Sequence, residues 1–303
     1  MQSITAKSPL VSVFMPAYNQ QEFIAAAIES VIKQDYDNIE LIIGDDCSTD
    51  NTWEIIQKYQ EKYPAIVKPF RNDENVGITA NCNKVLARCS GKYIAFTAGD
   101  DLFLPGKLLK QVVWLEQDEK RVLCGHQVEV FYEDGSPSHI LTPKLPSGGG
   151  AKWVIENGCP YGGVSIVVRK DCVPKTGYDE RLIFGSDQRL WIDCLGEKGE
   201  FGYIEGIYAK YRKHSNNITG KGDIILADIE SMLLHLKEEQ PVLSASVKKG
   251  LVHQVNIPRA RNLIRNGSYA NGIVKLLWLY FLYPRRLMET ILFRISKFKG
   301  LHT

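Results

Sequence analysis

Two pairs of neighbouring carboxylates stand out, because carboxylates can bind a divalent cation, a ribose or a nucleotide base. Asp45 and Asp46 follow one apolar run, and Asp100 and Asp101 follow another. A single pair would be weak evidence, since Asp side chains commonly cap a following helix. Asp50, which directly precedes a helix-like segment, is better explained in that way. Two pairs at the strand ends of one sheet indicate a polar ligand site.

A parallel sheet would bring the two pairs together, and the first hundred residues have the pattern of one. Short β-rich runs alternate with segments whose apolar residues repeat at helical spacing, as in an α/β fold. In such sheets, ligands bind at the carboxyl ends of the strands. The expected strands are 11–15, 39–43, 66–70 and 93–96, and the expected helices are 23–32, 52–59 and 81–89.

The first strand also ends in residues that could contact a ligand, since it leads into Pro16-Ala17-Tyr18-Asn19. No glycine-rich phosphate-binding loop follows any of the strands. A nucleotide bound here would therefore need a cation for its phosphates, and Asp100 and Asp101 are the obvious ligands.

The rest of the chain has a more mixed pattern. Residues 122–131 and 162–169 are further strand candidates, and 147–150 has the composition of a flexible loop. Beyond Asn217 the pattern is helical to the end. We place a domain boundary near Gly220, so that 221–303 form a separate helical region.

The composition is that of an ordinary globular protein, with 303 residues, 44% hydrophobic and 24% charged. The net charge of +2 gives no support to nucleic-acid binding. The seven cysteines are odd in number and include no Cys-x-x-Cys pair, which favours a reducing cytosol over a disulfide framework or zinc site. The N-terminus lacks the apolar core of a signal peptide, and no apolar run reaches the ~20 residues of a membrane span.

The C-terminal region is basic, because residues 251–303 contain nine Lys and Arg but a single acid, Glu289. An apolar run at 276–283 and an apolar helical stripe accompany these charges, which predicts an element on a membrane surface. The alternative is that the stripe packs on the rest of the chain or on a second subunit of a homo-oligomer. The stripe consists of Leu287, Met288, Ile291, Leu292, Ile295 and Phe298.

Several motifs, in order along the chain, resemble those of family 2 glycosyltransferases of the GT-A fold, in particular bacterial enzymes of O-antigen, capsule or other surface-polysaccharide assembly. The resemblance implies a Rossmann-like, mostly parallel sheet flanked by helices, with a nucleotide-binding half at about 8–105 and an acceptor half at about 106–220. It also implies transfer of a hexose or N-acetylhexosamine with inversion. The matching segments are 11–19, 30–34, 40–50, 75–77, 91–96, 99–107 and 184–191.

The resemblance implies a nucleotide site at these positions. Tyr18 would lie against a uracil, Asp46 would accept the uracil N3 proton, and Asp100 would contact the ribose or the metal. UDP is therefore favoured over GDP or dTDP, although thymine would offer the same N3 proton. The full expected nucleotide site comprises Pro16, Ala17, Tyr18, Asn19, Asp46, Gly77, Asn81, Asp100 and Arg212.

The resemblance also implies the catalytic groups. Asp101 and His214 would ligate Mn²⁺ or Mg²⁺ on the diphosphate, and Arg212 would pair with phosphate oxygens. Ala98 stands where the family has the first acid of its metal motif. Asp187 would be the general base that takes the proton of the acceptor hydroxyl. From the residue alone, Asp187 could equally cap the helix that begins there.

The implied acceptor is a saccharide on a polyprenyl diphosphate lipid, which would make the chain a cytoplasmic protein at the inner face of the plasma membrane. Two other functions stay open. A sugar nucleotidyltransferase would normally have a basic, glycine-rich loop after the first strand, which is absent here. A membrane-docked nucleotide-binding scaffold without turnover is suggested by Ala98, Asn81 and Ser186. The retained Asp46, Asp101 and Asp187 favour an enzyme.

Overall fold

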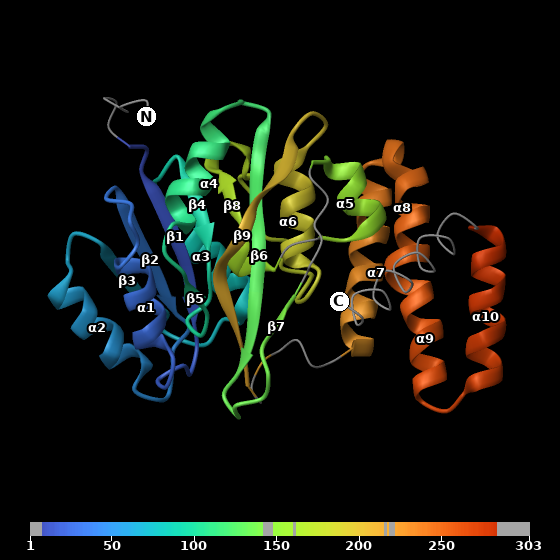
Figure 1. Cartoon of the computed structure of the whole chain (residues 1–303), viewed down its shortest axis with the longest axis horizontal. Coiled ribbons are helices and arrows are strands. Elements are labelled where there is room, and N and C mark those ends of the chain that lie inside the picture. The colour runs from blue at the N-terminus through green and yellow to red at the C-terminus, as the bar shows by residue number, and fades with distance from the viewer. Residues whose placement is uncertain (1–7, 142–147, 160–161, 215–216, 218–221, 284–303) are drawn as a thin grey trace, which may run out of the picture. The chain divides into compact units, whose positions relative to one another are not determined.

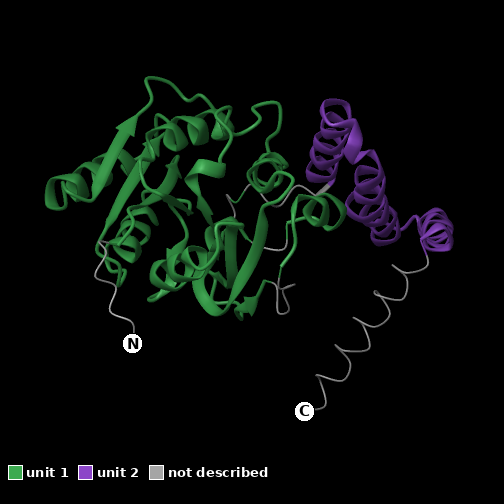
Figure 2. Cartoon of the chain, turned by 90° about the horizontal axis from the view of Figure 1, so that it is seen from above, with its two compact units in different colours: residues 1–220 green, residues 221–303 purple. Residues whose placement is uncertain are grey.

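The computed structural model describes residues 8–141, 148–159, 162–214, 217 and 222–283. Contacts divide the chain into two compact units, Met1–Gly220 and Lys221–Thr303, which are described separately (Figure 2). No helix among the described residues is long and apolar enough to cross a membrane. The predicted apolar stripe at 287–298 lies outside the described residues.

A mixed sheet flanked by helices forms the first unit (Figure 1). Its strands are β1 (Val11–Ala17), β2 (Ile39–Asp45), β3 (Val67–Arg71), β4 (Tyr93–Phe96), β5 (Leu102–Phe103), β6 (Arg121–Tyr132), β7 (His139–Ile140), β8 (Val167–Arg169) and β9 (Glu200–Lys213). Its helices are α1 (Ile24–Ile32), α2 (Thr52–Lys62), α3 (Ile78–Arg88), α4 (Lys107–Glu116), α5 (Ala151–Asn157) and α6 (Ser186–Leu195).

The strand order is β3-β2-β1-β4-β8-β6-β9-β5, with β7 paired to β6. The first four strands in this order are parallel, as predicted, and Ala17 at the end of β1 lies opposite Asp45 at the end of β2. Beyond β4 the pairing is mixed, because β8 runs antiparallel to both β4 and β6 while β9 runs parallel to β6. The predicted α/β class with a central sheet flanked by helices is confirmed.

The parallel half is held together by apolar burial on both faces of the sheet. Every residue of β2 is buried, which is typical of a parallel strand covered by helices on both sides. Helix α1 buries Ile24, Ala27, Ile28 and Val31, a spacing that places all four on one face. Each large apolar side chain buried in this way contributes roughly 1.5–3 kcal/mol to stability. The packing fixes the carboxyl ends of β1, β2 and β4 side by side.

Several predicted elements have different bounds in the structure, and two of these differences lie beside the cavity. The helix expected at 81–89 begins earlier, at Ile78, directly after Gly77 with its left-handed φ of 86°. The strand expected at 162–169 is reduced to β8, because Gly163–Ser165 form a 3₁₀ turn.

The second unit is helical, as expected. Helix α7 (Gly222–Glu239) is followed by α8 (Ser244–Gly250), a π-helical segment (Leu251–Asn256) and α9 (Ile257–Arg265), which packs against α10 (Tyr269–Leu282). A small core of Val252, Ile257 and Leu279 links α9, α10 and the π-helical segment.

Candidate active site

A cavity of about 1060 Å³ lies at the carboxyl ends of β1 and β4. Its walls come from the loops after these strands, from α3 and α6, and from β6 and β9. Eleven of the twelve predicted site residues line it, and Arg212 is the exception. The eleven are Pro16, Ala17, Tyr18, Asn19, Asp46, Gly77, Asn81, Asp100, Asp101, Asp187 and His214.

Asp46 lies at one end of the cavity and is buried. Its Oδ1 accepts hydrogen bonds from the Asn72 Nδ2 at 2.8 Å and from the Val76 N–H at 3.0 Å. Its Oδ2 accepts one hydrogen bond, from the Gly77 N–H at 3.0 Å. A carboxylate oxygen can accept about two hydrogen bonds, so Oδ2 retains capacity for one donor from a ligand.

The loop beside Asp46 is held by the other acid of the pair. Buried Asp45 accepts hydrogen bonds from the Ser48 N–H and hydroxyl and lies 3.3 Å from the Arg71 Nε. Desolvation raises the pKa of Asp45, and the two Ser48 donors oppose that rise. Ser48 in turn accepts a hydrogen bond from the Asn19 N–H, while Tyr18 next to it is half exposed. Asp45 therefore supports the loop and does not line the cavity.

Gly77 and Asn81 line the same end of the cavity in different ways. Gly77 presents only backbone, and its N–H is already bonded to Asp46. The Asn81 amide donates to the Gly44 carbonyl and accepts from Asn72, so its polar atoms are used within the protein. Asn81 therefore binds the sheet and the loop that holds Asp46.

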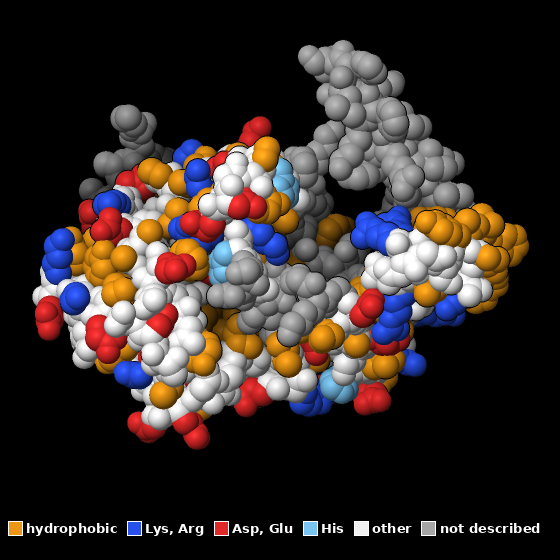
Figure 3. All heavy atoms as spheres, turned by 90° about the horizontal axis from the view of Figure 1, so that it is seen from below, with side chains coloured by type: hydrophobic (Ala, Val, Ile, Leu, Met, Phe, Trp, Pro, Cys, Tyr) orange, Lys and Arg blue, Asp and Glu red, His pale blue; other side chains and the backbone are white. Residues whose placement is uncertain are grey.

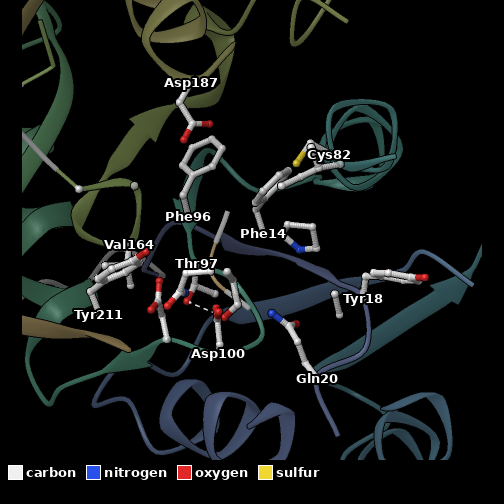
Figure 4. Close-up of a pocket in the computed structure, with 18 of the residues that line it drawn as sticks. Phe14, Tyr18, Gln20, Cys82, Phe96, Thr97, Asp100, Val164, Asp187 and Tyr211 are labelled. Atoms are coloured by element: carbon white, nitrogen blue, oxygen red, sulfur yellow. Dashed lines mark hydrogen bonds between the residues drawn. The ribbon is translucent and has the colours of Figure 1, made fainter. Parts of the chain in front are cut away.

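Asp100 and Asp101 lie in the loop after β4 and are both buried. The Asp100 Oδ2 is 3.0 Å from the Nε2 of His214, and the Asp101 Oδ1 accepts a hydrogen bond from the Arg212 N–H. Burial, together with the neighbouring Asp100, raises the pKa of Asp101 well above its usual range. Asp100 and His214 are therefore in contact at the cavity wall, and Asp101 follows Asp100 in the same loop (Figure 4 shows Asp100).

Arg212 lies behind this point and not in the cavity. Its Nε donates to the Asp100 carbonyl, and its Nη1 forms an ion pair with Glu133. Its guanidinium also lies over the rings of Phe23 and Phe131, at 4.8 and 4.7 Å. The next residue, Lys213, lines the cavity instead. In this structure Arg212 holds the Asp100 loop in place.

The side chains of Asp100, Asp101 and His214 fit a divalent cation that a bound substrate would also ligate. No group of three or more His, Cys, Asp or Glu among the described residues is arranged to hold a metal alone. Mg²⁺ is commonly held by one or two carboxylates together with substrate phosphates, which is what Asp100 and Asp101 could offer.

Asp187 enters the cavity from the first turn of α6, on the side opposite Asp100 in the close-up view (Figure 4). Its carboxylate faces the open cavity, and a Cβ placed on Gly163 would lie 3.6 Å from its Oδ2. The Asp187 side chain is exposed to the cavity, while desolvation by the protein around it raises the pKa of Asp187 and the Tyr178 phenol opposes the rise. Asp187 therefore presents a carboxyl group to the open cavity.

Several residues that line the cavity were not predicted from the sequence. Tyr178 stacks on Phe14 at 6.1 Å between ring centroids, and the wall formed by β6 and β7 includes Tyr132 and His139. None of these residues follows a parallel strand, so the strand-end rule could not find them. A tyrosine nine residues before the proposed base was the available signal for Tyr178.

Comparison with known proteins assigns the chain to a family. The model of "Glycosyl transferase family 2" matches residues 12–172, more than half of the chain. The chain belongs to this family. It is a glycosyltransferase, which sets aside the nucleotidyltransferase alternative.

One curated relative and two solved structures extend the comparison. The chain is 38% identical over 212 residues to the Escherichia coli protein WfaP, named a UDP-Glc:alpha-D-GlcNAc-diphosphoundecaprenol beta-1,3-glucosyltransferase, covering 69% of this chain and 80% of WfaP. The Staphylococcus aureus TarS 1–349 complex with UDP-GlcNAc has a TM-score of 0.59 at 18% identity and covers 91% of each chain.

The second structure is the mannosyltransferase PcManGT of Pyrobaculum calidifontis with GDP-Man and Mn²⁺, with a TM-score of 0.59 at 14% identity over 94% of this chain and 84% of that one. At such identities the two structures show the fold alone, and they confirm the predicted GT-A fold.

Proposed function

We propose that this glycosyltransferase moves a sugar from a UDP-sugar to a hydroxyl group of a saccharide acceptor, with inversion at the anomeric carbon, in surface-polysaccharide assembly. One observation carries the proposal: a single cavity is lined by Asp46, by the pair of acids Asp100 and Asp101, and by a separate carboxylate at Asp187. These are the groups that a nucleotide, a diphosphate and an acceptor hydroxyl require.

The donor nucleotide is assigned from the hydrogen bond that the Asp46 carboxylate can still accept. The Oδ2 atom has one protein donor, so it can accept the N3 proton of uracil. Tyr18 beside it offers a ring on which the base can stack. The uridine donors named for WfaP and for the TarS complex support the same choice.

The diphosphate would lie against Asp100, Asp101 and His214. These residues would hold Mn²⁺ or Mg²⁺, and a bound cation supplies charge stabilisation for the departing nucleoside diphosphate. Arg212 keeps the Asp100 loop in place through its hydrogen bond to the Asp100 carbonyl. PcManGT, which has the same fold, is named with Mn²⁺.

Asp187 would act as the general base. It takes the proton of the acceptor hydroxyl while that oxygen forms a bond to the anomeric carbon. The bond between the anomeric carbon and the diphosphate oxygen breaks on the opposite side, which inverts the configuration. Asp187 suits this role because it faces the cavity away from the acids at the diphosphate (Figure 4).

Two measurements test the donor and the reaction. Thermal unfolding with UDP, GDP, dTDP or CMP, each with and without Mn²⁺, should show the largest stabilisation for UDP with Mn²⁺. Transfer is then measured from UDP-glucose and UDP-N-acetylglucosamine to an alkyl-diphosphate-linked GlcNAc, with the anomeric configuration of the product read by NMR. A retained configuration, or no stabilisation by any uridine nucleotide, would contradict the proposal.

The acceptor is proposed to be lipid-linked, and α10 provides a surface that could meet the lipid bilayer. Seven large apolar side chains on this helix are exposed, with Phe281 at 81%. Residues 240–283 also contain six Lys and Arg and no acid. Figure 3 shows hydrophobic side chains gathered at one end of this unit, with basic side chains next to them. An apolar helix face with basic neighbours is typical of a helix lying in an anionic membrane interface.

Vesicle flotation tests this surface. The protein should float with vesicles that contain a third phosphatidylglycerol and not with pure phosphatidylcholine vesicles. Phe281→Glu should abolish flotation, whereas Val242→Glu, at an equally exposed apolar residue of the same unit outside α10, should not. A dimer that Phe281→Glu dissociates, without vesicle binding by the wild type, would instead assign the face to a second subunit.

A further inference from the structure

We propose that Gly163, in the 3₁₀ turn that faces Asp187, is a specificity-determining residue that keeps room for the acceptor saccharide beside the general base. The inference rests on the proposed role of Asp187 and adds to it the part of the cavity wall against which the acceptor lies. Its basis is a glycine that the fold itself does not require.

Gly163 has a backbone conformation that other residues adopt readily. It opens the 3₁₀ turn Gly163–Ser165, and its φ lies outside the left-handed region that favours glycine. In the part of the chain that the structure describes, a Cβ on Gly163 would come within 4 Å of one atom beyond its chain neighbours, the Asp187 Oδ2 at 3.6 Å. That distance is an ordinary van der Waals contact. Alanine would therefore fit the protein at this position.

Glycines elsewhere in the first unit are required by packing. A Cβ on Gly202 of β9 would lie 2.0 Å from the Trp114 ring, and a Cβ on Gly91 would lie 2.6 Å from the backbone of β1. The fold explains both of these glycines, because a side chain at either position would force atoms apart. The space in front of Gly163 belongs instead to the cavity, since Gly163 and Asp187 both line it.

The turn is held from behind, which fixes its place in the cavity wall. The buried Gln111 side chain of α4 donates from Nε2 to the Ser165 carbonyl and to the Cys124 carbonyl of β6, both at 2.8 Å. Its Oε1 accepts a hydrogen bond from the buried Lys107 Nζ at 2.8 Å. The Ser165 N–H and hydroxyl both donate to the Gly162 carbonyl, at 2.9 and 2.7 Å. A methyl group added to the turn would therefore project into the cavity.

The turn lies away from the proposed uracil site. In the close-up view, its Val164 is on the side of the cavity away from Tyr18 (Figure 4). Val128 and Leu141 continue the wall, because a Cβ on Gly162 would lie 3.9 and 3.1 Å from their side chains. An apolar wall of this kind suits the C–H face of a sugar ring and leaves the hydroxyl groups on the ring edge free for polar contacts.

The group that must approach the Asp187 carboxylate is the acceptor hydroxyl. A hydroxyl that donates to a carboxylate lies about 2.7 Å from the oxygen, so the carbon that carries the hydroxyl lies at roughly 3.5 Å. An alanine methyl at position 163 would fill part of that shell, at 3.6 Å from the Oδ2. Glycine leaves the shell open to the substituted carbon of a saccharide. A water molecule has no such carbon and needs less space.

Gly163→Ala should therefore separate transfer to a saccharide from hydrolysis of the donor by water. We expect kcat/KM for the alkyl-diphosphate-linked GlcNAc to fall about 10- to 100-fold, the range for a methyl group too many in a packed site. Hydrolysis of the UDP-sugar in the absence of an acceptor should stay unchanged. The Kd for UDP in calorimetry should stay unchanged as well.

Stability distinguishes this role from a structural one. Alanine at a compatible backbone position lowers the entropy of the unfolded chain, so Gly163→Ala should raise the unfolding midpoint by about 1–4 °C. Gly196→Ala is the matched control, since Gly196 ends α6 with a left-handed φ of 51° and does not line the cavity. It should lower the unfolding midpoint and leave transfer unchanged.

An equal loss of transfer and hydrolysis in Gly163→Ala would assign the space to the donor sugar and overturn the inference, as would unchanged transfer or a lower unfolding midpoint. If the wild type transfers no sugar in the donor and acceptor panel, the proposed function fails and the inference is decided by binding. Saturation-transfer NMR with the alkyl-diphosphate-linked GlcNAc, in the presence of UDP and Mn²⁺, then compares wild type with Gly163→Ala. Saccharide signals that are seen with the wild type and lost with the variant support the inference, and equal signals, or none with either protein, refute it.

Discussion

Replacement of Asp46 by asparagine tests the donor assignment most directly. The substitution keeps the shape of the side chain but turns one acceptor oxygen into a donor. Because Oδ1 accepts two protein hydrogen bonds and Oδ2 accepts one, the asparagine oxygen should occupy the Oδ1 position. Its NH₂ group then faces the Gly77 N–H and the ligand, which are both donors.

The magnitude follows from the bonds that are lost. One hydrogen bond to a charged group contributes about 1.5–3 kcal/mol, which corresponds to an increase of about 10- to 150-fold in the Kd for UDP. The Gly77 N–H loses one of its two acceptors and keeps the Asn75 Oδ1 at 3.2 Å, whereas a fully unsatisfied donor would cost about 1–3 kcal/mol of stability. Gly77 is partly exposed, so the lower end of this range applies.

The same exchange should alter base preference. Cytosine N3 is an acceptor, so the wild type should bind UMP more tightly than CMP, and Asp46→Asn should narrow or reverse this preference. Isothermal titration calorimetry with UDP, UMP and CMP measures both effects. Asp73→Asn is the control, because Asp73 is an exposed acid in the same loop that does not line the cavity. If the Kd of Asp46→Asn for UDP is within twofold of the wild-type value, the assignment is refuted.

Three further outcomes are expected. Asp187→Asn should lower kcat by about 10²- to 10⁴-fold with unchanged UDP affinity in calorimetry. As the pH is lowered, the wild-type rate should begin to fall at a pH above the ordinary pKa of Asp, because desolvation raises the Asp187 pKa. Asp101→Asn should remove the extra thermal stabilisation that Mn²⁺ gives to the UDP complex while the shift with UDP alone persists. Glu40, whose pKa is lowered to about 2 by its hydrogen bonds to Lys68, Ser12 and Ser90, should stabilise the fold above pH 4.5 and lose that contribution as pH falls towards 2. Glu40→Gln should therefore cost at most about 3 kcal/mol in urea unfolding at pH 7 and much less at pH 3.

The parallel half of the sheet could be predicted because its signals are local. An apolar run such as 39–43 lies within one strand, and the carboxylates that follow it mark the strand end. β5, β7 and β9 were not predicted as strands. β9 has an irregular burial pattern, and its pairing with β6 joins residues far apart in the sequence. Periodicity within a segment carries no information about such partners.

Single residues of the site also have partners that lie far away in the sequence and that a local pattern does not reveal. The strand-end rule found Asp46, Asp100 and Asp101, which line one cavity. Arg212 was expected on a phosphate, but the structure pairs it with Glu133, 79 residues earlier. Its guanidinium is a rigid fork that binds any carboxylate or carbonyl of suitable geometry, so the sequence alone could not specify its partner.

Helix α3 contacts residues on several sides of the cavity. Directly before its first turn, the Gly77 N–H binds Asp46 at the proposed uracil site. Asn81, on a second face, binds the Gly44 carbonyl of the sheet, while Asn83 holds the backbone of Tyr178. An asparagine amide both donates and accepts, so it can pair with a backbone N–H and carbonyl together, which an arginine cannot do. Two asparagines on this helix therefore favour contacts within the protein over contacts with a phosphate, and through them the helix holds both the sheet and the chain segment that precedes α6.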